Sequence, residues 1–218
     1  MTASTRSVVA ILVSVASLMW AAASTPVRAE IIDRVLAVVD GQIVTLSDVQ
    51  AALRFGLIPA DVSTDPIVAG MRRMIDRRLM LHEVERYAPP EPPAAAIDKG
   101  AAAVQARFKD AVAFETALNT SVLTREQLRG FIRDSIRIDA YLQQRFSTSA
   151  EPSEDDIARY YKEHAPEFVV IGVQQSFEQA RGQVRARILE ARQEQAIADW
   201  LEGLRRRSVV SVLYLPVR

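Results

Sequence analysis

Two histidines and one pair of carboxylates are the side chains whose types and spacing could serve catalysis or metal binding. His82-Glu83 begins like the zinc motif H-E-x-x-H, but position 86 is arginine, so the second imidazole ligand is missing. His164 stands in His-Ala-Pro at an expected helix end, where histidine interacts favourably with the helix dipole. Asp155-Asp156 lies at an expected helix start, where acidic side chains complement the same dipole. We interpret these residues as helix-surface groups and expect no metal site.

Other catalytic and nucleotide-binding signatures are missing from the sequence. Its 218 residues contain no G-x-G-x-x-G, no Walker loop, no G-x-S-x-G and no cysteine. A serine without a placed base is not a nucleophile, and a chain without cysteine has no disulfide, CxxC redox pair or thiolate metal site. We therefore expect neither an enzyme nor a cofactor, and we expect any activity to be independent of ATP.

Arginine clusters are the remaining candidates for a binding site. They are Arg72-Arg73, Arg77-Arg78 and Arg205-Arg206-Arg207. Acidic residues are interspersed with them, and the chain has 27 basic and 27 acidic side chains in total. A neutral balance gives no general attraction to nucleic acid or anionic lipid. We interpret the clusters as solvated helix faces and expect no nucleic-acid partner.

The first 29 residues have the composition of a secretory signal peptide. Arg6 gives a positive start, Val8–Ala23 is apolar and uncharged, and Val27-Arg28-Ala29 resembles an A-x-A cleavage site. The alternatives are a buried helix or an uncleaved anchor, but the apolar run is about 16 residues and a membrane span needs about 20. We expect cleavage between Ala29 and Glu30, localisation in the periplasm and no stable membrane insertion afterwards.

The next segment predicts a β-hairpin that opens directly into a helix. Two β-type runs, Arg34–Val39 and Gln42–Leu46, flank Asp40-Gly41, a pair typical of a two-residue turn with positive φ. Thr45 and Asp48 have the spacing of a capping box, so a helix should begin there. Both faces of this hairpin are apolar, and an isolated hairpin is barely stable in water. We expect the strand-like run Val209–Leu215 to join it in one small sheet.

The rest of the chain predicts helices joined by short breaks, which makes the fold class mostly α with a small β element. Proline and capping residues mark the helix starts, and apolar residues recur at helical spacing. The expected helices are Pro66–Tyr87, Ala94–Phe108, Ala113–Asn119, Arg125–Arg145, Ser153–His164 and Ser176–Arg206. The last of these, the long closing helix, has an apolar stripe that changes side halfway along. We expect its first half to pack on a helical body and its second half on the hairpin.

Several of these segments, in this order, resemble the SurA-like periplasmic chaperones. The opening hairpin is similar to the start of that family, and the order of the later motifs agrees throughout. The matching segments are Ile75–Val84, Leu123–Arg145, Ser153–Phe168, Phe177–Arg181 and Trp200–Arg205. The resemblance covers nearly all of the chain after the leader. It implies a helical chaperone core with a peptide-binding role.

One departure from the family concerns enzymology. These proteins usually carry a parvulin-type prolyl isomerase domain before the closing helix, but here only eight residues separate Phe168 from Phe177. We expect residues 30–218 to form the SurA-like core without that insert. Peptidyl-prolyl isomerase activity is then a further alternative that only the name of the family would suggest.

The resemblance implies unfolded polypeptide clients, above all outer-membrane proteins. Methionine side chains adapt to varied apolar partners, which suits a surface that accepts many sequences, although core filling is the commoner role for any single one of these residues. The candidate client-binding residues lie on the second helix and in the loop before it: Phe55, Leu57, Ile58, Met71, Met74 and Met80. We expect an ATP-independent holdase for outer-membrane or secreted proteins. The alternative is a dedicated interaction subunit of an envelope complex.

Overall fold

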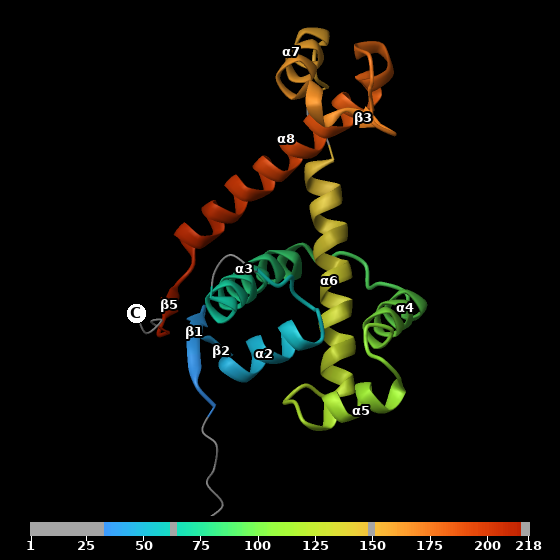
Figure 1. Cartoon of the computed structure of the whole chain (residues 1–218). Coiled ribbons are helices and arrows are strands. Elements are labelled where there is room, and N and C mark those ends of the chain that lie inside the picture. Colours follow the sequence, from blue (N-terminus) through green and yellow to red (C-terminus); the bar gives the residue numbers. More distant parts are fainter. Residues whose placement is uncertain (1–32, 62–64, 148–150, 215–218) are drawn as a thin grey trace, which may run out of the picture. The chain divides into compact units, whose positions relative to one another are not determined.

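The computed structural model describes residues 33–61, 65–147 and 151–214 (Figure 1). The expected signal peptide and its cleavage site at Ala29 and Glu30 lie outside these residues. Helices dominate the described chain, so the expected mostly α fold with a small β element is confirmed. Among the described residues, no helix is both long and apolar enough to cross a lipid bilayer.

The first hairpin and the C-terminal strand form one antiparallel sheet. Strand β1 (Val35–Val39) lies between β2 (Gln42–Thr45) and β5 (Val210–Val212), as Figure 1 shows. The turn residues Asp40 and Gly41 have φ values of 47° and 82°, as their residue types predict. The expected union of first and last segments is confirmed, although β5 is shorter than the run Val209–Leu215. Leu215 lies outside the described residues.

Capping residues fix where the helices begin. Thr45 and Asp48 form the expected capping box of α2 (Leu46–Arg54), with the Thr45 hydroxyl 3.2 Å from the Asp48 N–H. Asp65 caps α3 (Pro66–Tyr87), whose first residue is proline. Ala88 then takes a left-handed conformation before the proline-rich corner. These local signals were sufficient to predict the helix starts because each depends on residues at most three positions apart.

The later helices follow the prediction with small shifts. The described bounds are α4 (Ala94–Gln105), α5 (Ala111–Asn119), α6 (Arg125–Phe146), α7 (Glu154–His164) and the long α8 (Phe177–Arg207). Helix α4 ends three residues before the expected Phe108. Helix α5 starts two residues before the expected Ala113, because the Asp110 side chain accepts the Ala113 N–H at 2.8 Å and so caps the helix.

Three main apolar cores hold these elements. The first lies under the sheet and contains β1, β2, α2, α3 and Leu204 from the end of α8. The second surrounds Phe55 and joins α4, α5 and α6. The third joins α7 to the first half of α8 through Ile157, Val184 and Ile188. The two halves of α8 therefore have different partners, as its divided apolar stripe predicts. The partner of the first half is α7 with the segment just after it, rather than a larger helical body. The second half packs mainly on α3 and α6 and reaches the core under the sheet through Leu204, so the expectation that it packs on the hairpin is correct only in part.

The segment between Phe168 and Phe177 forms a second, separate hairpin that the sequence analysis did not predict. Its strands are β3 (Val169–Val170) and β4 (Val173–Gln174), joined by Ile171 and Gly172. Within the described residues these two strands form a sheet of their own. Their apolar side chains are exposed, so no packing signal was available to identify them.

Candidate functional site

Three neighbouring hollows surround the junction between the α2–α3 loop and helix α6. Their volumes are about 260, 480 and 410 Å³, and we call them the first, second and third hollow. Leu57 lines all three, Phe131 lines the first and second, and Arg77 lines the first and third. The hollows therefore share walls and form one connected region of the surface.

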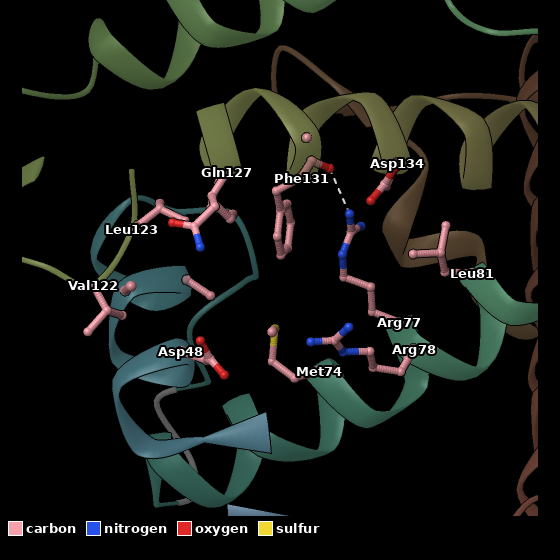
Figure 2. Close-up of a pocket in the computed structure, with 14 residues that line it drawn as sticks. Asp48, Met74, Arg77, Arg78, Leu81, Val122, Leu123, Gln127, Phe131 and Asp134 are labelled. Carbon is pink, nitrogen blue, oxygen red and sulfur yellow. Dashed lines mark hydrogen bonds between the residues drawn. The ribbon is translucent and has the colours of Figure 1, made fainter. Parts of the chain in front are cut away.

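Helical periodicity places the two long walls of the first hollow. Residues three and four positions apart lie on the same side of a helix. Helix α3 contributes Met74, Arg77, Arg78 and Leu81 at this spacing, and α6 contributes Gln127, Gly130, Phe131 and Asp134 at the same spacing. Figure 2 shows the two rows facing each other, with Asp48 of α2 and the segment Val122–Leu123 beside them.

The loop after α2 depends on a glycine at its tightest point. Gly56 has a positive φ of 62°, which most side chains disfavour. Its carbonyl accepts a hydrogen bond from Arg107 Nη1 at 2.5 Å, and a Cβ atom at this position would overlap that guanidinium. The turn closes with the Leu57 N–H on Ala52 O at 2.8 Å, which holds Leu57 at the centre of the three hollows.

Arg77 joins the two walls of the first hollow. Its guanidinium lies over the Phe131 ring, 3.6 Å from the centroid, and donates to Ser135 Oγ at 2.8 Å and Phe131 O at 2.7 Å. Burial lowers the pKa of Arg77 to about 10, so the group remains charged at neutral pH. Figure 2 shows this side chain rising from α3 towards the Phe131 carbonyl.

The second and third hollows have more apolar walls. Lys99 and Ser135 are the polar side chains of the second hollow, and the remaining lining is apolar or glycine. Helix α4 approaches α6 closely there, because a Cβ at Gly100 would lie 2.5 Å from the Ile132 side chain. The third hollow lies between α3, α6 and α8. Its apolar lining includes Met80, Leu142 and Leu201, and the charged side chains of Arg73, Asp76, Arg77 and Asp139 also border it. These walls can cover apolar groups of a polypeptide.

The six expected client-binding residues fall into two groups. Phe55 and Met71 are buried in the second and first cores, and the lining of the three hollows does not include them. Leu57 and Met74 line the first hollow, and Leu57, Ile58 and Met80 line the third. Ile58 and Met74 are also buried members of the first core. A client-binding role for the lining residues stays a prediction.

Sequence reasoning missed the α6 wall and the arginines of α3. Phe131 and Arg77 were assigned to a helix stripe and a solvated face, respectively. A spacing signal was present in the sequence. The lining positions of α3 (74, 77, 78 and 81) and those of α6 (127, 130, 131 and 134) repeat the same helical spacing. What the sequence did not show is that these two sides of the helices face each other across an unfilled space.

Neither histidine lines the three hollows, although His82 borders a smaller hollow next to Arg78 and Leu81. His82 is exposed on α3, and His164 contacts Glu167 Oε1 through Nδ1 at 2.9 Å and stacks on Tyr160. In the described part of the chain, no group of three or more His, Cys, Asp or Glu side chains is placed to hold a metal ion.

Comparison with known proteins identifies a structural relative. No family model matches the sequence, and no curated protein matches it. A solved structure reported with the virulence factor PEB4 and the periplasmic protein Cj1289, two SurA-like chaperones of Campylobacter jejuni, has a TM-score of 0.52 and 11% sequence identity. The match covers 83% of this chain and 100% of that chain. At this identity the likeness concerns the fold, and the chain therefore has the fold of a SurA-like chaperone.

Proposed function

We propose that this protein is an ATP-independent holdase that binds unfolded outer-membrane or secreted polypeptides in the periplasm. The observation that carries the proposal is the set of neighbouring hollows around Leu57, Phe131 and Arg77, whose walls combine apolar side chains with a few charged ones. An unfolded chain exposes apolar side chains, and their burial in such hollows needs no energy source. The shared fold with SurA-like chaperones supports the same role.

A glycine in the wall of the first hollow gives a sharp test. A Cβ at Gly130 would meet nothing within 4 Å, so a larger side chain there would occupy the hollow without disturbing the core. Gly182 of α8 is also surrounded by open space, and it lines none of the three hollows. Leucine favours a helix over glycine at both positions, so both variants should fold.

We expect Gly130→Leu to weaken client binding about tenfold, since blocking the burial of one apolar side chain costs at least about 1.5 kcal/mol. The Gly182→Leu control should bind as the parent does. The measurement is suppression of aggregation of an unfolded outer-membrane β-barrel protein without ATP, titrated against chaperone concentration. Equal loss in both variants, or in neither, would contradict a role for the first hollow.

We also propose that the chain has no prolyl isomerase activity. The eight residues between Phe168 and Phe177 form the β3–β4 hairpin, which is too small for a catalytic pocket. Prolyl exchange in a short test peptide should keep its uncatalysed time of tens to hundreds of seconds in the presence of the protein. Catalysis that survives removal of contaminating isomerases would contradict this proposal.

The proposed function also requires that the protein is exported and that its mature chain forms one domain. We propose that residues 1–29 are a cleaved signal peptide and that residues 30–218 form one chaperone core. Because β1 and β5 pair across the chain, both ends contribute to the same core. N-terminal sequencing of the periplasmic protein should begin at Glu30. A membrane-bound protein that keeps residues before Glu30 would contradict cleavage and indicate that residues 1–29 are a membrane anchor.

The second candidate is a dedicated interaction subunit of an envelope complex. It is favoured by one observation: Val169, Val170, Ile171 and Val173 are exposed on the second hairpin, with Ile171 97% exposed. Exposed apolar clusters are typical of protein-binding surfaces. Crosslinking in intact cells separates the two candidates. Many β-barrel clients would support the holdase, and one constant partner captured at the second hairpin would support the subunit.

A further inference from the structure

Four charged side chains line the first hollow, and the two carboxylates among them already have partners. Asp48 Oδ2 accepts the Thr45 N–H at 3.1 Å in the capping box of α2. Asp134 forms an ion pair with Arg133 at 2.7 Å. The negative charges of this hollow are therefore engaged within the chain.

The two guanidinium groups donate their side-chain hydrogen bonds to neutral acceptors. Arg77 donates to Ser135 Oγ and Phe131 O, and Arg78 Nη1 donates to Gln42 Oε1 at 2.7 Å. Among the described residues, neither arginine has a carboxylate within 4.0 Å, the limit for an ion pair. Asp134 and Asp139 lie near Arg77 and favour its charged form, and the hydrogen bonds of Arg77 go to Ser135 and Phe131. A guanidinium has five N–H donors, so both groups keep donors for a further acceptor.

Arg77 is also held in place before any ligand arrives. Its contact with the Phe131 ring and its two hydrogen bonds fix the guanidinium between α3 and α6. A fixed donor loses less conformational entropy on binding than a free side chain. Arginine matches the planar geometry of a carboxylate, which can accept two parallel hydrogen bonds.

Apolar side chains lie directly beside these donors. Met74, Leu81, Leu123 and Phe131 line the same hollow. Figure 2 shows Met74, Leu81 and Phe131 around the two arginines and Leu123 farther away, beyond Phe131. The hollow measures about 260 Å³, which is below the roughly 300–1,000 Å³ of a pocket for a drug-sized ligand. The space suits one residue that carries both an apolar side chain and a carboxylate on the same Cα.

We propose that the first hollow binds the C-terminal residue of a polypeptide, with its apolar side chain on the wall and its α-carboxylate on Arg77 and Arg78. This inference rests on the proposed chaperone function and narrows it to chains that present a free C-terminus. An internal segment would have to supply the two groups from different residues and pass through the hollow.

The test compares two peptides that differ only in the terminal charge. A fluorescein-labelled hexapeptide, Ser-Gly-Ser-Gly-Gly-Leu, is titrated with the mature protein as the free acid and as the C-terminal amide. Hydrogen bonds to charged groups are strong enough that we expect the acid to bind about tenfold more tightly than the amide. This comparison uses the unaltered protein, so it does not depend on the folding of a variant.

Variants then locate the effect. Arg78→Gln should abolish most of the preference for the acid, because it removes one of the two charged donors. The variant should fold, because the Arg78 side chain donates to Gln42 and does not join α3 to α6. Arg187→Gln, on an exposed part of α8, is the matched control for loss of one charge and should keep the preference. Arg77→Gln should act as Arg78→Gln does if it folds.

The remaining outcomes are separable. Equal binding of acid and amide, or a preference that survives Arg78→Gln, would overturn the proposal. Arg78-dependent binding of an amidated peptide with an internal glutamate beside leucine, at least as tight as that of the free acid, would also overturn it in favour of a side-chain carboxylate. Failure of the proposed chaperone function would give a different result. The protein would then not suppress client aggregation, whatever the ratio of its affinities for the acid and the amide peptide.

Discussion

The chain contains two β-hairpins that share one turn geometry and differ in almost everything around it. Asp40-Gly41 has φ values of 47° and 82°, and Ile171-Gly172 has 50° and 75°. The first hairpin is covered by α3 and extended by β5, whereas the second lies open to solvent. The comparison separates what a turn needs locally from what a hairpin needs in order to be stable.

The first hairpin has a turn residue that suits its conformation. Aspartate tolerates the left-handed region, and the Asp40 carboxylate accepts the Val209 N–H at 2.9 Å while the Asp40 N–H donates to Val209 O at 2.9 Å. The turn is therefore tied to the strand that joins the sheet. In the second hairpin a β-branched isoleucine takes the same conformation, which costs roughly 1–2 kcal/mol. Such strain is often kept at functional sites.

Core packing gives the largest expected difference between the hairpins. Leu36 in β1 is fully buried, so Leu36→Ala should lower the free energy of unfolding by about 2–5 kcal/mol. Val170→Ala in β3, where the side chain is 48% exposed, should change it by less than about 0.5 kcal/mol. Urea unfolding followed by circular dichroism measures both. Similar losses in the two variants would mean that the second hairpin is covered in solution.

Removal of the third strand gives the next largest effect. Truncation after Ser208 deletes β5 and two half-buried side chains, Val210 and Tyr214. We expect a loss of about 2–3 kcal/mol from their burial and the strand hydrogen bonds. Val209, Val212 and Leu213 are exposed, so their removal should add little to this loss. An unchanged melting temperature would exclude β5 from the folding unit.

Replacement of the turn residue Asp40 tests how much the turn itself contributes to the stability of the first hairpin. Asp40→Ile places a β-branched residue at φ 47° and removes the acceptor for the Val209 N–H. We expect a loss of about 1–2 kcal/mol in the free energy of unfolding. Asp40→Asn is the control, because asparagine tolerates this conformation and keeps an oxygen acceptor. If both variants lose the same stability, the charge of Asp40 matters more than its backbone conformation.

The reverse change in the second hairpin has the smallest expected effect. Ile171→Asn relieves the strain and removes a 97% exposed apolar side chain, so we expect a gain of up to about 1 kcal/mol. The same thermal and urea experiments detect it. A clear loss of stability would show that Ile171 packs against something in solution, and that result would favour the interaction-subunit candidate.

Local signals made much of the fold predictable. The Thr45 capping box and the Asp40-Gly41 turn appear where the sequence predicted them, and two helices begin at the predicted Pro66 and Arg125. Each depends on residues no more than three positions apart, so no long-range information is needed. The second hairpin escaped prediction because isoleucine is a poor turn residue at positive φ. Its short strands also gave no alternation between buried and exposed residues.

The candidate site was predictable only in part. Leu57, Ile58, Met74 and Met80 were singled out by residue type, and the structure places them on the walls of hollows. Phe55 and Met71 have the same character and are buried in cores. Residue type alone does not distinguish an apolar side chain that fills a core from one that borders a space.

The sequence by itself determined the helix starts, the first turn and the union of hairpin and C-terminal strand, because these follow from local hydrogen bonding and from apolar faces that need cover. Only the tertiary structure decided which helix sides face each other. Met74, Arg77 and Phe131 form a site because α3 and α6 pack at Leu57 and leave space beside it. That space depends on how side chains from distant segments fit together, and a helical stripe in one segment does not specify its partner.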